Sequence, residues 1–369
     1  MSRRRASDIT RWMSIGAGVT GLLVLGLAVS LLWPESAARH AAPVALLAGD
    51  PARLSTAPGS GRPASAPTAS PTAVAPAKAT SSTDEASPAG ASSVATTPLQ
   101  AAGASIEAYR GLGSWVDIYD ARAWADPRAV IADLSGHGVR TLYVETGNSA
   151  SDGTVFDPKG QAAFITAAHE RGMRVVAWYL PSLTDVGRDY ARIASAIALR
   201  DSGGRGFDSF ALDIESDSVK PTGERNGALL GLSRRIRSLV GSDYPLGAII
   251  PAPVGMRQTP GYWDDFPYRQ LAGTYDVIVP MAYYTYHGDG AASARQDSRD
   301  DMRILRAQPG CATIPVHLVG GVAEDSTPAE LAAFLTTARE TGCIGASLYG
   351  WAATTPSDWR ALRAVSNWR

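Results

Sequence analysis

The stretch Arg174-Val-Val-Ala-Trp-Tyr-Leu180, followed after a helix-like segment by Phe207-Asp-Ser-Phe-Ala-Leu-Asp-Ile-Glu215, is typical of a strand–helix–strand unit. Both runs are short and apolar, as expected for strands buried in a parallel sheet. Six further runs of the same kind flank this unit, at residues 113–120, 139–146, 246–251, 275–284, 314–320 and 344–351. The sequence therefore predicts eight strands that alternate with helices.

The segments between these runs begin and end as helices do. Asp126-Pro127 and Asp157-Pro158 each place a capping side chain before a proline at the first helical position. Thr327-Pro-Ala-Glu330 is a capping box. A glycine ends four of the segments just before the next run: Gly138, Gly172, Gly241 and Gly342.

Eight strand–helix pairs within residues 106–369 match a (β/α)8 barrel, which typically needs about 250 residues. An open, doubly wound sheet is the alternative, but such sheets more often have fewer strands. No Gly-x-Gly-x-x-Gly turn follows the first run, and there is no Walker-type loop. We therefore predict an α/β protein with one (β/α)8 barrel over residues 106–369, preceded by a transmembrane helix and a disordered linker.

The N-terminus has the pattern of a membrane anchor. Four arginines precede an uncharged run, residues 12–33, that is rich in Leu, Val, Ala and Gly, and about 20 such residues span a bilayer. The positive-inside rule places residues 1–12 in the cytoplasm, residues 13–33 in the membrane and the rest outside the cytoplasm. A cleaved signal peptide, which would leave the protein secreted, is the alternative, but its apolar region is usually shorter.

Residues 34–105 mix Ala, Pro, Ser and Thr without a single aromatic residue. Such a segment cannot bury enough apolar surface to offset the entropy lost on ordering, so we expect a disordered linker. The formal net charge of −1 gives no reason to expect a nucleic-acid partner. The lipid bilayer is one expected partner, and the protein is expected to be monomeric.

The two cysteines precede neighbouring strands. Cys311 lies before the seventh run and Cys343 before the eighth, which places both at the N-terminal rim, the stability face of such a barrel. Outside the cytoplasm this placement permits a disulfide bond. We expect that bond, with two buried free thiols as the alternative.

The fourth run carries two carboxylates at the end where barrel enzymes place their catalytic groups. Alternate residues of a strand share a face, so Asp213 and Glu215 point into the barrel together with Ala211. Neighbouring like charges do not both ionise at low cost, so one pKa rises. A carboxylic acid then stays protonated near neutral pH and serves as a general acid.

Aromatic and polar residues stand at the ends of other runs. Met281 and Tyr283 share a face on the sixth run, as do Tyr349 and Trp351 on the eighth. The first three runs add further candidates: Trp115, Asp117, Tyr119, Glu145, Trp178 and Tyr179. Aromatic faces stack on sugar rings, and tyrosine hydroxyls hydrogen-bond polar groups of a substrate. An acidic pocket lined by aromatic side chains indicates a carbohydrate site.

These motifs resemble a known family. Asp208-x-x-Ala211-x-Asp213-x-Glu215 is similar to the Asp-x-x-Asp-x-Asp-x-Glu motif on the fourth strand of glycoside hydrolase family 18, the chitinases and related N-acetylglucosaminidases. Met281-Ala-Tyr283 resembles the Met-x-Tyr that ends strand six in this family. Trp351 stands where the family has a tryptophan at the floor of the sugar site.

The resemblance implies a mechanism. Glu215 would protonate the glycosidic oxygen, and Asp213 would orient a substrate 2-acetamido group that itself acts as nucleophile. Tyr283 would hydrogen-bond the acetamido group, and Trp351 would form the platform beneath the sugar.

The sequence departs from the family pattern at two places. Ala211 replaces the middle aspartate of the motif, and the Ser-x-Gly-Gly of the family is missing from the third strand. A neighbouring family of glycosidase-like barrels is therefore the alternative, with Glu145 or Asp117 as further partners in the site.

The sequence contains no motif of a zinc hydrolase or a serine hydrolase. The five histidines form neither His-x-His nor His-Glu-x-x-His, and there is no Gly-x-Ser-x-Gly elbow. We therefore expect no metal and no cofactor.

We predict a membrane-anchored, extracytoplasmic glycoside hydrolase whose substrate is a cell-wall or extracellular polysaccharide. A catalytically inactive carbohydrate-binding barrel, favoured by Ala211, and a barrel enzyme without a sugar substrate are the alternatives. An open groove that exposes Glu215 and Trp351 would favour the sugar, and a small closed pocket would not.

Overall fold

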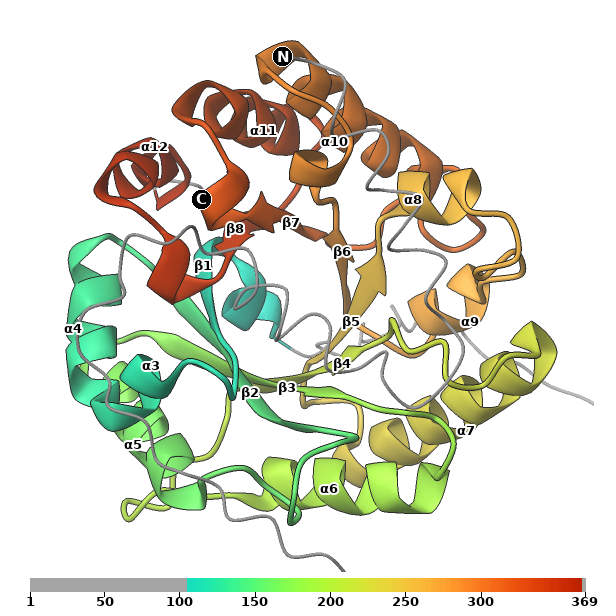
Figure 1. Cartoon of the computed structure of the whole chain (residues 1–369). Helices are drawn as coiled ribbons and strands as arrows, with labels where there is room; N and C mark the ends of the chain where they lie inside the picture. The colour runs from blue at the N-terminus through green and yellow to red at the C-terminus, as the bar shows by residue number, and fades with distance from the viewer. Residues whose placement is uncertain (1–104, 367–369) are drawn as a thin grey trace, which may run out of the picture. The chain divides into compact units, whose positions relative to one another are not determined.

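The computed structural model describes residues 105–366. Its eight parallel strands form a closed barrel in chain order, and β8 pairs with β1 to complete the ring. Figure 1 shows this ring with the helices on its outside. The predicted (β/α)8 barrel is therefore confirmed.

Each strand is followed by at least one α-helix. The strands are β1 (Gly111–Val116), β2 (Thr141–Asn148), β3 (Arg174–Leu180), β4 (Ser209–Asp213), β5 (Leu246–Pro251), β6 (Val277–Met281), β7 (His317–Val322) and β8 (Gly345–Tyr349). The helices are α3 (Ala121–Ala125), α4 (Pro127–Gly136), α5 (Pro158–Glu170), α6 (Val186–Ala198), α7 (Thr222–Val240), α8 (Pro253–Gln258), α9 (Tyr268–Ala272), α10 (Ala291–Arg306), α11 (Pro328–Glu340) and α12 (Pro356–Ser366). The 3-10 helices are η1 (Ile106–Tyr109), η2 (Tyr284–Tyr286), η3 (Ala323–Asp325) and η4 (Trp351–Ala353).

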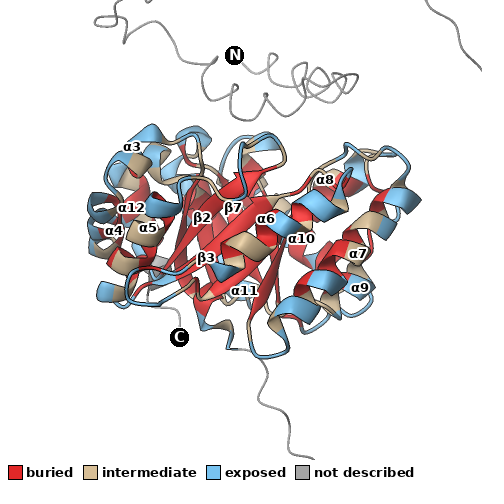
Figure 2. Ribbon diagram, turned by 90° about the horizontal axis from the view of Figure 1, so that it is seen from below, coloured by how far each residue is buried: buried red, intermediate tan, exposed pale blue. Residues whose placement is uncertain are grey.

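Alternate strand residues contribute to two hydrophobic layers. Leu142, Phe210 and Leu348 face outward and pack under the helices, whereas Ala211 and Val319 belong to the cluster that fills the barrel. Figure 2 shows the buried strands at the centre and the helices with their exposed faces outward. The two-residue period of β4 thus has the predicted phase, because Ala211 lies inside and Phe210 outside.

The 3-10 helix η1 closes the barrel at the N-terminal ends of its strands. Tyr109 is fully buried; its hydroxyl lies 2.6 Å from Ser209 Oγ, and its carbonyl oxygen lies 2.9 Å from His317 Nδ1. A Cβ at Gly247 would come within 2.5 Å of the Tyr109 hydroxyl, so this close approach requires glycine. Burial in this floor lowers the pKa of His317 to about 4.

The predicted helix boundaries are present in the structure. Asp126 and Asp157 accept hydrogen bonds from backbone N–H groups in the first turns of α4 and α5. Thr327 and Glu330 form the capping box of α11. The four glycines expected at helix ends have φ between 68° and 81°, which favours glycine at the turn into the next strand.

The expected disulfide bond between Cys311 and Cys343 is not present, and both residues are free thiols. Strand β7 begins only at His317, so Cys311 lies buried in the turn after α10 rather than next to the strand. The Cys343 thiol lies 3.8 Å from Met302 Sδ and 3.6 Å from Thr341 Oγ1. Burial raises the pKa of both thiols, that of Cys343 to about 11, so both remain protonated at neutral pH.

The expected anchor at residues 13–33 and, apart from Ser105, the expected linker at residues 34–105 lie outside the described residues. Within residues 105–366 no helix combines the length and apolar character that crossing a bilayer requires.

Candidate active site

Two carboxyl groups lie at the C-terminal end of β4. Asp213 ends the strand and is 6% exposed, and the main-chain carbonyl of Glu215 accepts a hydrogen bond of 2.8 Å from the Tyr262 hydroxyl. Burial raises the pKa of Glu215 to about 7. Burial, and then the charges of Glu215 and Glu145, raise the pKa of Asp213 well above its usual range. The pair therefore holds protons near neutral pH, and burial contributes more to this than the like charges on which the prediction rested.

A third carboxyl group comes from β2. Glu145 is 2% exposed; its carboxylate accepts hydrogen bonds from Ile118 N at 3.0 Å and from Asn148 Nδ2 at 3.2 Å. Burial, with smaller contributions from Asp117 and Glu215, raises its pKa to about 8. Glu145 thus belongs to the same electrostatic cluster as the β4 pair.

Asp117 and Tyr349 connect the first strand to the last at the mouth. The Tyr349 hydroxyl donates to Asp117 Oδ2 at 2.8 Å, and the other carboxylate oxygen accepts from the backbone N–H groups of Tyr119 and Asp120. Burial, followed by the charge of Asp117, raises the pKa of Tyr349 well above its usual range. Both residues are therefore held in place at the mouth, as the sequence predicted for this end of the barrel.

A cavity of about 20 Å³, room for about one water-sized group, opens beside Asp213 and Tyr349, whereas Glu215, Glu145 and Asp117 do not line it. Its lining contains six of the residues that the sequence singled out, together with two aliphatic ones: Trp115, Trp178, Asp213, Met281, Tyr283, Tyr349, Ile249 and Val319. The structure thus brings together side chains from seven of the eight strands and their ends. The site is a small cavity rather than the open groove, exposing Glu215 and Trp351, that was expected for a sugar substrate.

The floor of this cavity is rigidly held. The Trp115 indole stacks on Tyr143 with 4.2 Å between ring centroids and 13° between planes. Its Nε1 donates to Ser347 Oγ at 2.8 Å, and Ser347 Oγ lies 3.0 Å from His317 Nε2. His317 is thus a packed residue of the barrel interior.

Two of the predicted substrate-binding residues lie elsewhere. Tyr179 faces the outer layer, where its hydroxyl donates to Asp189 Oδ1 at 2.9 Å, because it stands one residue beyond the inward-facing Trp178 on β3. Trp351 lies in η4 beyond the end of β8, and its Nε1 donates to Asp133 Oδ2 of α4 at 2.8 Å. The Trp351 ring also lies under the guanidinium of Arg122, so it does not line the cavity.

Sequence reasoning missed two residues of the mouth. The side-chain amide of Asn148 donates to the Glu145 carboxyl group at 3.2 Å and to the Tyr119 hydroxyl at 3.0 Å. Tyr286, 48% exposed, packs edge-on against Tyr283 with 5.5 Å between ring centroids. Asn148 is the last residue of β2 and Tyr286 ends the 3-10 helix η2 that follows β6; this place near strand ends was the available signal, but the local pattern does not single them out.

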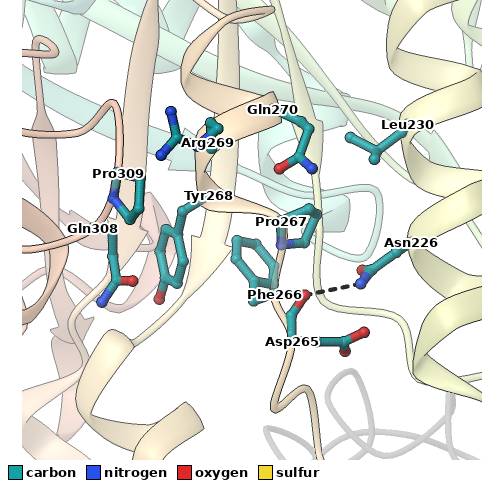
Figure 3. A pocket seen from close by; sticks show the side chains of 10 residues that line it. All are labelled: Asn226, Leu230, Asp265, Phe266, Pro267, Tyr268, Arg269, Gln270, Gln308 and Pro309. Atoms are coloured by element: carbon teal, nitrogen blue, oxygen red, sulfur yellow. Dashed lines mark hydrogen bonds between the residues drawn. The ribbon is translucent and has the colours of Figure 1, made fainter.

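A larger crevice, of about 360 Å³, lies outside the barrel between α7, α9 and the end of α10. Figure 3 shows its lining, with the Asn226 side chain joined to the main-chain oxygen of Asp265 by a hydrogen bond of 2.9 Å. None of the predicted site residues lines it. Among residues 105–366, no group of three His, Cys, Asp or Glu side chains is placed to hold a metal ion.

The geometry defines a class of protein, a (β/α)8 barrel with carboxyl and aromatic groups at its C-terminal mouth. No family model and no curated protein matches the sequence. Among solved structures, the fold is similar to that of an endo-β-1,4-mannanase from Thermotoga petrophila, with a TM-score of 0.54 at 10% identity over 70% of this chain and 76% of that chain. A chitinase from Chromobacterium violaceum has a TM-score of 0.50 at 12% identity over 70% of this chain and 100% of that one.

The spore cortex-lytic enzyme SleL from Bacillus cereus is similar too, with a TM-score of 0.52 at 13% identity over 70% of this chain and 74% of that chain. At such identities the likeness shows the fold. The chain thus has the barrel fold of these glycoside hydrolases, a chitinase among them, as the motif resemblance implied.

Proposed function

We propose that the protein is a glycoside hydrolase in which Glu215 is the general acid. The observation that carries the proposal is the pair of carboxyl groups at the mouth of the barrel, Asp213 buried and Glu215 half-buried, both with a raised pKa. A solvent-exposed glutamate is almost fully ionised at neutral pH. Burial raises the pKa of Glu215 to about 7, so a large fraction of the molecules keeps the proton that a leaving glycosidic oxygen needs.

The size of the cavity constrains how a sugar binds. About 20 Å³ accommodates one small group, so the sugar ring lies above the cavity and only a substituent enters it. Asp213 and Tyr283 line the cavity and would hold that substituent. A 2-acetamido group is larger than this cavity, so only its oxygen end would enter; that oxygen attacks the anomeric carbon while Glu215 protonates the leaving oxygen, and no enzyme nucleophile is needed.

The aromatic support for the sugar ring comes from different residues than the family motif implies. Trp351 is hydrogen-bonded to Asp133 and lies away from the cavity. Tyr349 lines the cavity, and Tyr286 is exposed beside Tyr283. We therefore assign ring contacts to Tyr349 and Tyr286.

A carbohydrate-binding barrel without activity is the second candidate. Its support is the replacement of the middle aspartate by Ala211, which lies in register with Trp178 of β3. The indole fills space beside Ala211, and the cavity that remains is small. Such a site could bind a glycan without cleaving it.

We further propose that residues 13–33 anchor the barrel to the cell membrane and that residues 34–105 hold it outside the cytoplasm, near a cell-wall or extracellular polysaccharide. The support is the basic N-terminus followed by an uncharged apolar run. Addition of protease to intact cells should remove the barrel from the cell surface. Protection of the barrel until the membrane is broken would contradict this placement.

The test of the activity uses the full-length protein and its Glu215→Gln variant, incubated with peptidoglycan, chitin oligomers and unacetylated glucans and mannans. Reducing ends released by the wild type but not by the variant would support a glycosidase that depends on Glu215. The polymer that responds would give the substrate class. Binding of a glycan by both proteins without release of reducing ends would favour the second candidate.

A further inference from the structure

Two polar atoms at the candidate site have no hydrogen-bond partner. Among the buried side-chain atoms of residues 105–366, Trp178 Nε1 and Asp213 Oδ1 are both unpaired. Both residues are 6% exposed, and both line the same cavity. A buried donor or acceptor left unpaired is unfavourable, so an unpaired donor and an unpaired acceptor in one cavity indicate a ligand that pairs with both.

The strand register explains why the indole N–H has no partner in the protein. Trp178 of β3 is in register with Ala211 of β4, and Asp213 follows on the same inner face of β4. A methyl group at position 211 accepts no hydrogen bond. Two neighbouring donors do not pair with Asp213 Oδ1, the unpaired acceptor. Trp115 Nε1 donates to Ser347 Oγ, and the Tyr349 hydroxyl donates to Asp117.

The two unpaired atoms restrict the chemistry of the ligand. The indole N–H only donates, and the Asp213 carboxyl group has an accepting oxygen whether or not it is protonated. A hydroxyl or an amide satisfies both, because each has an oxygen that accepts and an O–H or N–H that donates. A protonated amine only donates, so it would leave the indole N–H unpaired.

On this basis we propose that Trp178 is a specificity-determining residue of the candidate active site. Its indole N–H binds the oxygen of a sugar substituent whose own O–H or N–H donates to Asp213, and the site selects sugars with a neutral hydroxyl or amide over sugars with an amine. This inference rests on the proposed glycoside hydrolase activity and adds to it the substituent that the cavity accepts.

The experiment measures kcat/KM of the full-length wild type and the Trp178→Phe variant on matched oligomers of N-acetylglucosamine, glucosamine, glucose and mannose. The wild type should prefer an acetylated or a hydroxylated oligomer to glucosamine. The variant, which keeps an aromatic ring but loses the N–H, should lose roughly 10- to 100-fold on the preferred oligomer, as expected for a site left without one hydrogen-bond partner. Its loss on glucosamine oligomers should be smaller, because a protonated amine makes no hydrogen bond to the indole N–H.

The matched control is Trp263→Phe, which removes an indole whose Nε1 donates to Asn226 at 2.7 Å, away from the cavity; its selectivity among the four oligomers should equal that of the wild type. A Trp178→Phe variant that loses the same factor on all four oligomers would overturn the inference, because that result shows a packing role. Wild-type preference for glucosamine would overturn it too. If the wild type neither cleaves nor binds any oligomer, the proposed function itself fails and the inference falls with it.

Discussion

At the scale of single residues, the protonation of each carboxyl group at the mouth depends on its neighbours. The charge of Glu215 raises the pKa of Glu145, and the charges of both raise the pKa of Asp213. Tyr349, Tyr283 and Asp117 face the same cluster. Because burial is the first cause in each of the three carboxyl groups, the pKa of each lies above that of an exposed carboxylate.

The Glu145→Gln variant tests this coupling. In the wild type, kcat/KM should fall above about pH 7 as Glu215 loses the proton it donates. The charge of Glu215 is one cause that raises the pKa of Glu145 to about 8, so Glu145 is still protonated when Glu215 ionises. The Glu145→Gln variant should therefore keep the pH at which kcat/KM falls. The pH profile of kcat/KM measures this, and a fall that moves to lower pH would show that Glu145 is already charged when Glu215 loses its proton.

A matched pair of Tyr→Phe variants tests which tyrosine belongs to the site. Tyr283→Phe removes a hydroxyl at the cavity and should lower kcat/KM by roughly 10-fold or more. Tyr179→Phe removes a hydroxyl that donates to Asp189 in the outer layer, so it should leave kcat/KM unchanged and lower the free energy of unfolding by about 1 kcal/mol. Kinetics and thermal unfolding of both variants measure this. Equal losses of activity would contradict the placement of Tyr179.

The two-residue period was sufficient to predict the inward placement of Asp213 beside Ala211, since β4 continues without a bulge to its end. The same rule fails for Trp351, because β8 ends at Tyr349 and the chain turns into η4 before that residue. It was not applied at Tyr179, which is adjacent to Trp178 and must therefore face the opposite side. Alternation is reliable within a strand and carries no information beyond its last residue.

At the scale of secondary-structure elements, capping side chains predict correctly where helices begin. Asp157 caps α5 through Gly160 N at 3.1 Å, and its own φ is 34°. Aspartate tolerates this left-handed region better than alanine does. The cap therefore depends on both the carboxylate and the backbone conformation.

The Asp157→Ala variant should lower the free energy of unfolding by about 1–2 kcal/mol, through the lost cap and the strained backbone. Its control is Asp152→Ala, at an exposed position in the same loop, which should change stability by less than about 0.5 kcal/mol. Chemical denaturation of both variants measures the difference. A loss of the same size at both positions would show that the cap contributes nothing specific.

The ends of strands are harder to predict from sequence than the starts of helices. A capping side chain and a proline specify where a helix begins, but an apolar run does not say which of its residues are hydrogen-bonded to a neighbour. The seventh apolar run begins at residue 314, whereas β7 begins at His317. This difference moved Cys311 away from the strand and was one reason why the disulfide prediction was wrong.

At the scale of the whole molecule, a buried carboxyl group that does not line the cavity couples stability to pH. Asp301 of α10 is 1% exposed; its Oδ1 accepts from Val254 N at 2.7 Å, and its Oδ2 has no partner. Burial raises its pKa from 3.8 to about 7. Between these values the folded state keeps a proton that the unfolded state has lost, so stability falls as the pH rises through this window.

The Asp301→Asn variant should remove this pH dependence, because the amide keeps the acceptor for Val254 N and carries no charge. At pH 8 the variant should be more stable than the wild type by about 1–3 kcal/mol, and near pH 4 the two should be equal. Thermal unfolding across this pH range measures the effect. A constant difference at all pH values would contradict the raised pKa of Asp301.

The barrel as a whole was predictable because eight apolar runs with capped helices between them leave few other arrangements. The interior was not predictable in the same way. Tyr109 of η1 fills the floor of the barrel and requires glycine at position 247 opposite it. Both features depend on contacts between segments that lie far apart in the sequence. Asp213 and Glu215 were singled out by their two-residue spacing at and after the end of β4, and Glu145 by its place in the second apolar run, but the interaction of the three charges becomes clear only once the barrel is closed.

The most direct test of the central claim, that Glu215 is the general acid of a glycoside hydrolase, is the dependence of kcat/KM on the leaving group. Wild type and Glu215→Gln would be compared on the natural oligosaccharide and on dinitrophenyl glycosides of the same sugar, whose leaving group needs no proton. The variant should lose roughly 10²- to 10⁴-fold on the oligosaccharide and only a few-fold on the dinitrophenyl glycoside. Equal losses on both substrates would contradict the assignment of Glu215 as the acid.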